Sequence, residues 1–289
     1  MRWQGQRRSA NVEDRRGSRA VRLGVGGGLG AIVLVVLYLL TGGDPNRLLE
    51  SLSEPAATEE AVGGDAGGGY VGSPEEESLR EFVSVVLART EDTWHGIFRE
   101  MGRSYREPKL VLFTGAVDSG CGFAQAAVGP FYCPRNEKVY IDLSFYGELQ
   151  DRFGASGDFA QAYVIAHEVG HHVQNLLGIS ADYEAARQRV GTEEANALSV
   201  RLELQADCFA GIWAHDLASA GDILEAGDIE EAVRAAGAIG DDRMQMRAQG
   251  YVAPDSFTHG TADQRARWFL RGRETGDIGV CDTFRSPSL

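Results

Sequence analysis

The stretch Asp158–Leu177 combines helical apolar spacing with a central His-Glu-Val-Gly-His-His sequence. Residues four apart on an α-helix differ by about 400° of rotation, so His167 and His171 lie on one face and can bind one metal ion. Glu168, one residue along, reaches the edge of that face, where it can accept a proton from a metal-activated water. The pattern predicts a buried metal-binding helix that ends at Gly178, and the rest of the fold must pack around it.

A later helical stretch supplies candidates for a third ligand, since a catalytic zinc takes three protein ligands and a water. The segment RLELQADCFAG, residues 201–211, places Glu203 and Asp207 four apart among apolar neighbours. Two carboxylates on a buried helix are costly unless they are paired or bind a metal. We assign Glu203 as the third zinc ligand and Asp207 as the residue that orients a ligand histidine. Exchanged roles, or two solvent-exposed acids, are the alternatives.

Three other residues near these motifs have open roles. His259, in SFTHGTADQR at 256–265, is a catalytic candidate that could stabilise an oxyanion. It could instead cap a helix or replace Glu203 on the metal. Arg265 is expected to pair with an acid of the fold. His172 lies about 140° around the helix from His167, which predicts a position off the metal.

The N-terminal region has the sequence pattern of a membrane anchor. Leu23–Leu40 is a run of 18 uncharged residues, long enough for a helix of about 27 Å that could span a bilayer core. Seven arginines precede the run, within residues 1–22. This bias predicts a single-pass anchor in the cytoplasmic membrane, with the N-terminus in the cytoplasm and the catalytic domain extracytoplasmic. A cleaved signal peptide or a soluble chain are the alternatives.

Composition divides the chain into four segments. These are a basic cytoplasmic tip (1–22), the transmembrane anchor (23–40), a flexible acidic Gly-rich linker (41–74) and a catalytic domain (75–289). The net charge is −14, and because residues 1–22 carry +5 the remainder carries −19, which argues against nucleic acid as a partner. The oligomeric state is left open by the sequence.

Four cysteines lie within the catalytic domain. An even number in an extracytoplasmic domain suggests two disulfides. The pair closest in sequence, Cys121–Cys133, is our first choice, which leaves Cys208–Cys281. Four free buried thiols are the alternative.

The predicted elements define the fold class. Strands are expected at 109–114, 123–134 and 138–143, and helices at 75–101, 144–153, 158–177, 181–220 (with a break near 191–192), 228–239 and 262–274. This order predicts an α+β domain in which a small, mostly antiparallel sheet packs on a helical bundle, preceded by one N-terminal transmembrane helix. Either 126–132 or 139–143 could be an edge strand that binds a peptide.

The combined motifs resemble the bacterial neutral zinc metallopeptidases, a membrane-anchored family with an HExxH zincin-like centre. They are CGFAQAAVGPFYCP at 121–134, KVYIDLSF at 138–145, HEVGHHVQNLLG at 167–178, RLELQADCFAG at 201–211 and SFTHGTADQR at 256–265. The match covers roughly Glu75 to Cys281. The resemblance implies a zincin-like fold, Zn²⁺ as cofactor and hydrolysis of a peptide or protein substrate, with Glu168 as general base. It implies no particular substrate.

Three functions are compatible with these features: an active endopeptidase, a zinc-binding but non-proteolytic scaffold, and a cell-wall peptide hydrolase. Glu168 favours an enzyme, because an inactive relative commonly loses the general base. The sequence has no obvious wall-binding repeat, which weighs against the third function.

Overall fold

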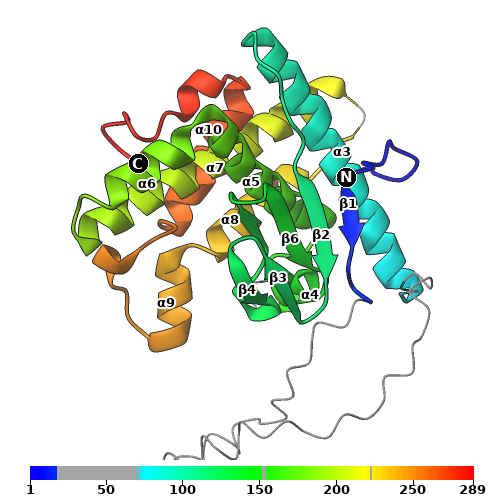
Figure 1. Ribbon diagram of the computed structural model, residues 1–289, viewed down its shortest axis with the longest axis horizontal. Helices are drawn as coiled ribbons and strands as arrows, with labels where there is room; N and C mark the ends of the chain where they lie inside the picture. The colour runs from blue at the N-terminus through cyan, green and yellow to red at the C-terminus, as the bar shows by residue number, and fades with distance from the viewer. Residues whose placement is uncertain (18–69, 71, 152–153, 222) are drawn as a thin grey trace, which may run out of the picture. The chain divides into compact units, whose positions relative to one another are not determined.

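The computed structural model describes residues 1–17, 70, 72–151, 154–221 and 223–289 (Figure 1). Met1–Gly17 and Val71–Leu289 form one compact unit. The expected anchor, 23–40, and nearly all of the expected linker, 41–74, lie outside the described residues. Across the part of the chain that is described, no helix combines the length and apolar character that a membrane crossing requires.

Helix α3 (Pro74–Glu100) begins at a strong initiation signal. The Ser73 side chain accepts a hydrogen bond from the Glu76 backbone N–H, and the Glu76 carboxylate accepts one from the Ser73 N–H. This capping box satisfies two N–H groups that the first helical turn leaves without intrahelical partners. The apolar face of α3 is buried and includes Phe82, Val83, Val86, Leu87, Trp94 and Phe98.

Four strands form the main sheet, in the order β1-β2-β6-β5. Strand β2 (Lys109–Phe113) pairs in parallel with β6 (Lys138–Asp142) and with β1 (Val12–Asp14), whereas β5 (Phe131–Cys133) pairs antiparallel with β6. The α+β class is confirmed, but the expectation of a mostly antiparallel sheet is wrong for this sheet. That expectation assumed that strands adjacent in sequence pair with each other. In the structure, β2 pairs in parallel with β6, which comes later in the chain than β5, and β1 from the N-terminal segment adds a second parallel pair.

The two faces of the sheet carry different apolar sets, because side chains alternate along a strand. Leu110, Leu112, Val139 and Ile141 join the main core with the helices, while Val111, Phe113 and Tyr140 join a smaller cluster. The smaller cluster includes Val117 of the hairpin formed by β3 (Ala116–Ser119) and β4 (Gly122–Gln125). The chain then passes through the short helix η1 (Ala126–Val128) into β5. The Cys121–Cys133 disulfide ties the hairpin to β5.

Helices make up most of the remaining chain. They are α4 (Ser144–Asp151), α5 (Asp158–Leu177), α6 (Ile179–Arg187), α7 (Thr192–Ala220), α8 (Asp228–Ala238), α9 (Asp241–Gln249) and α10 (Ala262–Thr275), with short η2 (Pro254–Ser256) and η3 (Ile278–Cys281). Helix α5 packs against α3, α7 and α8, and α7 packs against α10 (Figure 1).

Glycines allow the central helices to approach each other closely. A Cβ at Gly170, inside the histidine motif of α5, would lie 3.0 Å from the backbone oxygen of Ala206 in α7. A Cβ at Gly272 of α10 would lie 2.0 Å from the Cys208 carbonyl oxygen. The first of these contacts explains why a residue that costs helix stability occupies the centre of the motif.

The N-terminal segment packs on the domain instead of forming a separate tip. The α-amino group of Met1 is buried beside carboxylates of α5 and α8, at 2.7 Å from Asp158 and 3.2 Å from Asp228. Strand β1 extends the sheet, and the Arg16 guanidinium, 1% exposed, lies 2.7 Å from Glu77 of α3. Among the described arginines of this segment, Arg7, Arg8 and Arg16 pair with acids of α3.

Candidate metal centre

Helices α5 and α7 bring the three predicted metal ligands together. His167 and His171 share one face of α5, which ends at Gly178 in a left-handed conformation. Glu203 of α7 lies against both histidines. Its Oε2 is 3.1 Å from His167 Nε2, and its Oε1 is 3.5 Å from His171 Nε2. One ligand atom from each residue lies within 4.8 Å of the other two.

This arrangement fits a zinc ion. Tetrahedral bonds of about 2.0–2.1 Å place neighbouring ligand atoms about 3.3 Å apart, close to the two separations above. Two imidazoles and one carboxylate form a ligand set of known catalytic zinc sites, which keep a fourth position for water or substrate. His259, the alternative third ligand, is outside this group.

A second acidic group, made of Asp158, Asp228 and Glu231, also has the spacing of metal ligands. The Met1 α-amino group lies against two of its members, at 2.7 and 3.2 Å. This group therefore already holds a cation from the chain itself.

Asp207 fixes the orientation of His167. Its Oδ1 accepts a hydrogen bond from His167 Nδ1–H at 2.8 Å, so that Nε2 points toward Glu203. Arg265 of α10 binds the same carboxylate through Nε at 2.8 Å and Nη2 at 2.9 Å. The Tyr163 hydroxyl, one turn before His167, also donates to Asp207. The structure thus places Arg265 in a buried ion pair.

His171 is oriented by a different group. Its Nδ1 lies 2.9 Å from the side-chain oxygen of Gln174, three residues along α5. His172 lies off the metal group, as the helical angle predicts. Its Nε2 is 2.6 Å from the Arg106 carbonyl oxygen, and its Nδ1 is 3.0 Å from the Tyr132 hydroxyl of β5.

The carboxylates around the two histidines attract positive charge. Burial lowers the pKa of His167, but Asp207 and Glu203 raise it more, to about 10. Burial also lowers the pKa of His171, and the Glu203 charge raises it overall. Despite burial, the histidines hold the pKa of Glu203 well below its ordinary value. Burial likewise raises the pKa of Asp207, but Arg265 and His167 lower it to about 2. The point between the three predicted ligands therefore favours a cation.

Glu168 faces a cleft of about 1110 Å³, whose walls also include His167, His171 and Glu203. Within the described part of the chain, its carboxylate has no hydrogen-bond or ion-pair partner and is thus free to act on a bound molecule.

His259 lies on the wall of the same cleft, half exposed. Its Nδ1 is 3.2 Å from Asp241 Oδ1, and its backbone N–H donates to Asp241 Oδ2 at 2.6 Å. The hydrogen bond to Asp241 raises the pKa of His259 above its ordinary value. The histidine therefore carries positive charge to a higher pH than a free imidazole.

Sequence reasoning missed several residues around this site. Gln174 and Tyr163 lie three and four residues from a histidine on α5, so helical spacing could have identified both. Asp241 begins α9 and has no comparable signal, because only the chain path brings it to His259.

Both predicted disulfides, Cys121–Cys133 and Cys208–Cys281, are confirmed, with Cα separations of 5.8 and 5.6 Å. Two disulfides are typical of a protein that folds in an oxidising, extracytoplasmic environment.

Comparison with known proteins agrees with the site. The chain is 50% identical to the Escherichia coli (strain K12) protein named "Uncharacterized protein YpfJ", over 98% of this chain and 99% of that protein. It is 40% identical to "Uncharacterized protein Rv2575" of Mycobacterium tuberculosis (strain H37Rv), over 87% and 86%. No solved structure matches the chain. The model of one family, described as "Putative neutral zinc metallopeptidase", matches residues 1–284, and the chain therefore belongs to that family.

Proposed function

We propose that the chain is a zinc-dependent endopeptidase in which His167, His171 and Glu203 hold the metal. One observation carries the proposal: three ligand atoms converge at zinc spacing beside a free glutamate on the wall of a cleft. A binding scaffold would need the ligands but not the free Glu168 carboxylate.

Each side chain of the site has a definite task in this proposal. Zinc bound there would polarise the scissile carbonyl and lower the pKa of a water toward about 7. Glu168 accepts the proton of the attacking water and passes it to the leaving amine. His259, whose pKa Asp241 raises, stabilises in its cationic form the negative charge that develops on the carbonyl oxygen. Asp207 and Gln174 hold the two ligand histidines in their metal-binding orientations.

The cleft suggests how a peptide binds. Strand β6 lies between β2 and β5, so its backbone groups are already paired on both sides. Strand β5 is at the edge of the sheet, and residues 126–132, leading into and along it, line the cleft. We propose that an extended substrate adds to the sheet along β5, which favours the first of the two candidate segments. Pro130 lacks an N–H, so pairing would depend on Phe131–Cys133.

Cleavage of an unstructured protein substrate by the purified full chain tests this function. We expect cleavage that a chelator abolishes and that added zinc restores, and no cleavage by Glu168→Gln at equal zinc content. Equal cleavage rates for Glu168→Gln and the wild type would exclude the proposed general base. Full zinc occupancy without any cleavage would favour the scaffold.

We further propose that the compact unit is extracytoplasmic, on the evidence of the disulfides. Attachment to the membrane through residues 23–40 is a proposal from the sequence alone. A single crossing there would put residues 1–17 and 71–289 on opposite sides, whereas they pack together in the structure. The packing therefore opposes a single crossing through residues 23–40 in either orientation, and with the compact unit outside the cell it also opposes a cytoplasmic N-terminus.

A further inference from the structure

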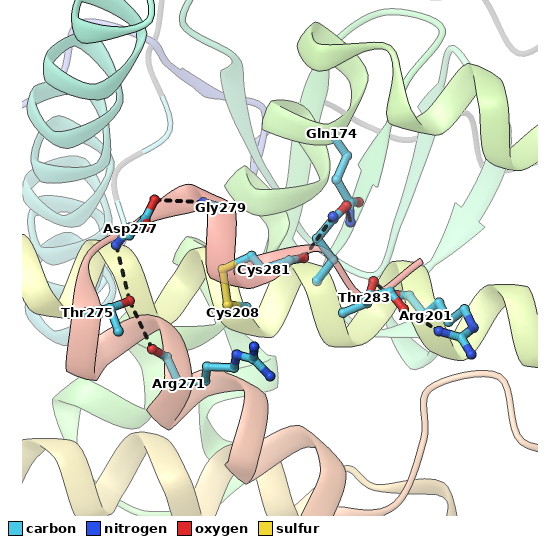
Figure 2. Close-up of a disulfide and its surroundings, with 10 residues drawn as sticks. Gln174, Arg201, Cys208, Arg271, Thr275, Asp277, Gly279, Cys281 and Thr283 are labelled. Carbon is cyan, nitrogen blue, oxygen red and sulfur yellow. Dashed lines mark hydrogen bonds between the residues drawn. A yellow bond between two sulfur atoms is a disulfide. The ribbon is translucent and has the colours of Figure 1, made fainter. Parts of the chain in front are cut away.

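The Cys208–Cys281 disulfide joins α7, the helix that carries Glu203, to η3, and Figure 2 shows Gln174 of α5 near it. Cys208 follows Asp207 directly in α7, and Cys281 ends η3 near the C-terminus. The tail is also held beyond Cys281, where the Thr283 hydroxyl donates to the Arg201 carbonyl at 2.6 Å (Figure 2). The backbone at Cys281 is thus fixed against α7 from two sides.

A chain of buried amide hydrogen bonds joins this point to His171. The Gln205 Nε2 donates to the Cys281 carbonyl oxygen at 3.0 Å, and the Gln174 Nε2 donates to Gln205 Oε1 at 3.1 Å. Gln174 Oε1 then accepts from His171 Nδ1 at 2.9 Å. Both glutamines are buried (Gln174 is 0% exposed and Gln205 4%), so water cannot readily substitute for these partners.

The direction of this chain is fixed at its far end. A backbone carbonyl can only accept, so Gln205 must present its NH₂ to Cys281 and its oxygen to Gln174. Gln174 must then present its NH₂ to Gln205, and it also donates to the Leu202 carbonyl oxygen at 2.7 Å. Its oxygen is left for His171, which must carry its proton on Nδ1. In the neutral imidazole this tautomer leaves Nε2 unprotonated, as metal binding requires.

We propose that Gln174 and Gln205 are positioning residues. Through them the fixed carbonyl of Cys281 sets the orientation of the His171 ring, and so the zinc affinity of the site. This inference rests on the proposed metal site, but not on peptide hydrolysis. Asp207 performs the corresponding task for His167, so the two ligand histidines are oriented by different chemistry, a carboxylate and an amide relay.

The test measures zinc affinity by competition with a chromophoric chelator, together with the visible absorption spectrum of the cobalt(II)-substituted protein. Gln174→Met should weaken zinc binding about 10- to 100-fold, as loss of a ligand's outer partner does. Gln205→Met leaves the His171 contact in place but frees Gln174, so a smaller loss of roughly 3- to 10-fold is expected. Both variants should shift the cobalt spectrum.

Two controls separate positioning from stability. Thr93→Val removes a partly buried hydrogen bond of 2.6 Å from α3 to Asp216 of α7, which does not touch the relay, so it should lower the melting temperature without changing zinc affinity. Cys121→Ala/Cys133→Ala removes the other disulfide and should also preserve zinc affinity. Cys208→Ala/Cys281→Ala should weaken zinc binding, and its effect should be non-additive with that of Gln205→Met, because both act through one relay.

The outcomes distinguish failure of the relay from failure of the proposed function. Weakened zinc binding in the glutamine variants supports the relay even if no variant cleaves peptides, in which case the proposed function alone fails. Unchanged zinc affinity and cobalt spectra, with melting temperatures lowered as in Thr93→Val, would show that the glutamines only satisfy buried packing and would overturn the inference.

Discussion

Replacing Asp207 with Asn should destabilise the fold and, as a second and separately measurable effect, weaken metal binding. The Asp207 side chain is 0% exposed and lies opposite the Arg265 guanidinium, which is 2% exposed. The substitution keeps the shape but leaves the arginine charge buried without its counter-charge, a change that typically costs about 3–5 kcal/mol. Because Asn retains an oxygen that can accept one hydrogen bond, we expect about 3 kcal/mol. For a unit of this size, that corresponds to a melting temperature lower by about 6–12 °C.

The same substitution should weaken zinc binding about 10- to 100-fold, because the one remaining amide oxygen is neutral and His167 Nδ1–H must share it with Arg265 and Tyr163. The assays are thermal unfolding of the metal-free protein and zinc titration against a chelator. Tyr163→Phe is the matched control, because it removes a neutral hydroxyl from the same carboxylate and should cost only about 1 kcal/mol. If Asp207→Asn unfolds within 2 °C of the wild type (about 1 kcal/mol or less) and binds zinc equally well, the buried ion pair does not support the site as argued.

Three further outcomes follow from other parts of the structure. Asp241 raises the pKa of His259, so its charge is complete below the unfolded pKa of about 6.5 and is lost as pH rises through the higher folded value. His259→Gln should remove the corresponding alkaline fall in kcat/KM, and an unchanged profile would exclude the role. Cysteines introduced at the exposed residues Ala10 and Ser288 should label equally in intact spheroplasts, whereas labelling of position 10 only after lysis would place the N-terminus in the cytoplasm. Deleting residues 2–17 should lower the melting temperature and promote aggregation, because β2 becomes an open edge; an unchanged melting curve would contradict the docking.

The sequence predicted the elements whose signals are local. Helix α5 has its apolar face and its terminating Gly178 within one continuous segment, and its predicted bounds are those of the structure. The two disulfides were also predicted, because sequence proximity decided the first pair. Helix α9 was missed because it has no buried residue and hence no apolar period to detect.

Long-range pairing set the limit of prediction. Strand β1 has three residues, none of them fully buried, and its identity depends on β2, almost a hundred residues later. The arginines on either side of β1 were interpreted as a topology signal, whereas in the structure Arg7 pairs with Glu91 and Arg16 with Glu77, both acids of α3. The role of Gln205 could not be predicted either, because it depends on the carbonyl of Cys281, which only folding brings within hydrogen-bond distance.

Zinc stoichiometry across a small set of variants tests the central claim most directly. Metal analysis of the purified full chain should give one zinc per chain for the wild type, for Glu168→Gln and for His259→Gln. His167→Ala, His171→Ala and Glu203→Ala should each retain little or none, because each loses one of the three atoms that converge in the structure. A full equivalent of zinc in Glu203→Ala would contradict the account, since the ion would then be held by residues other than this group.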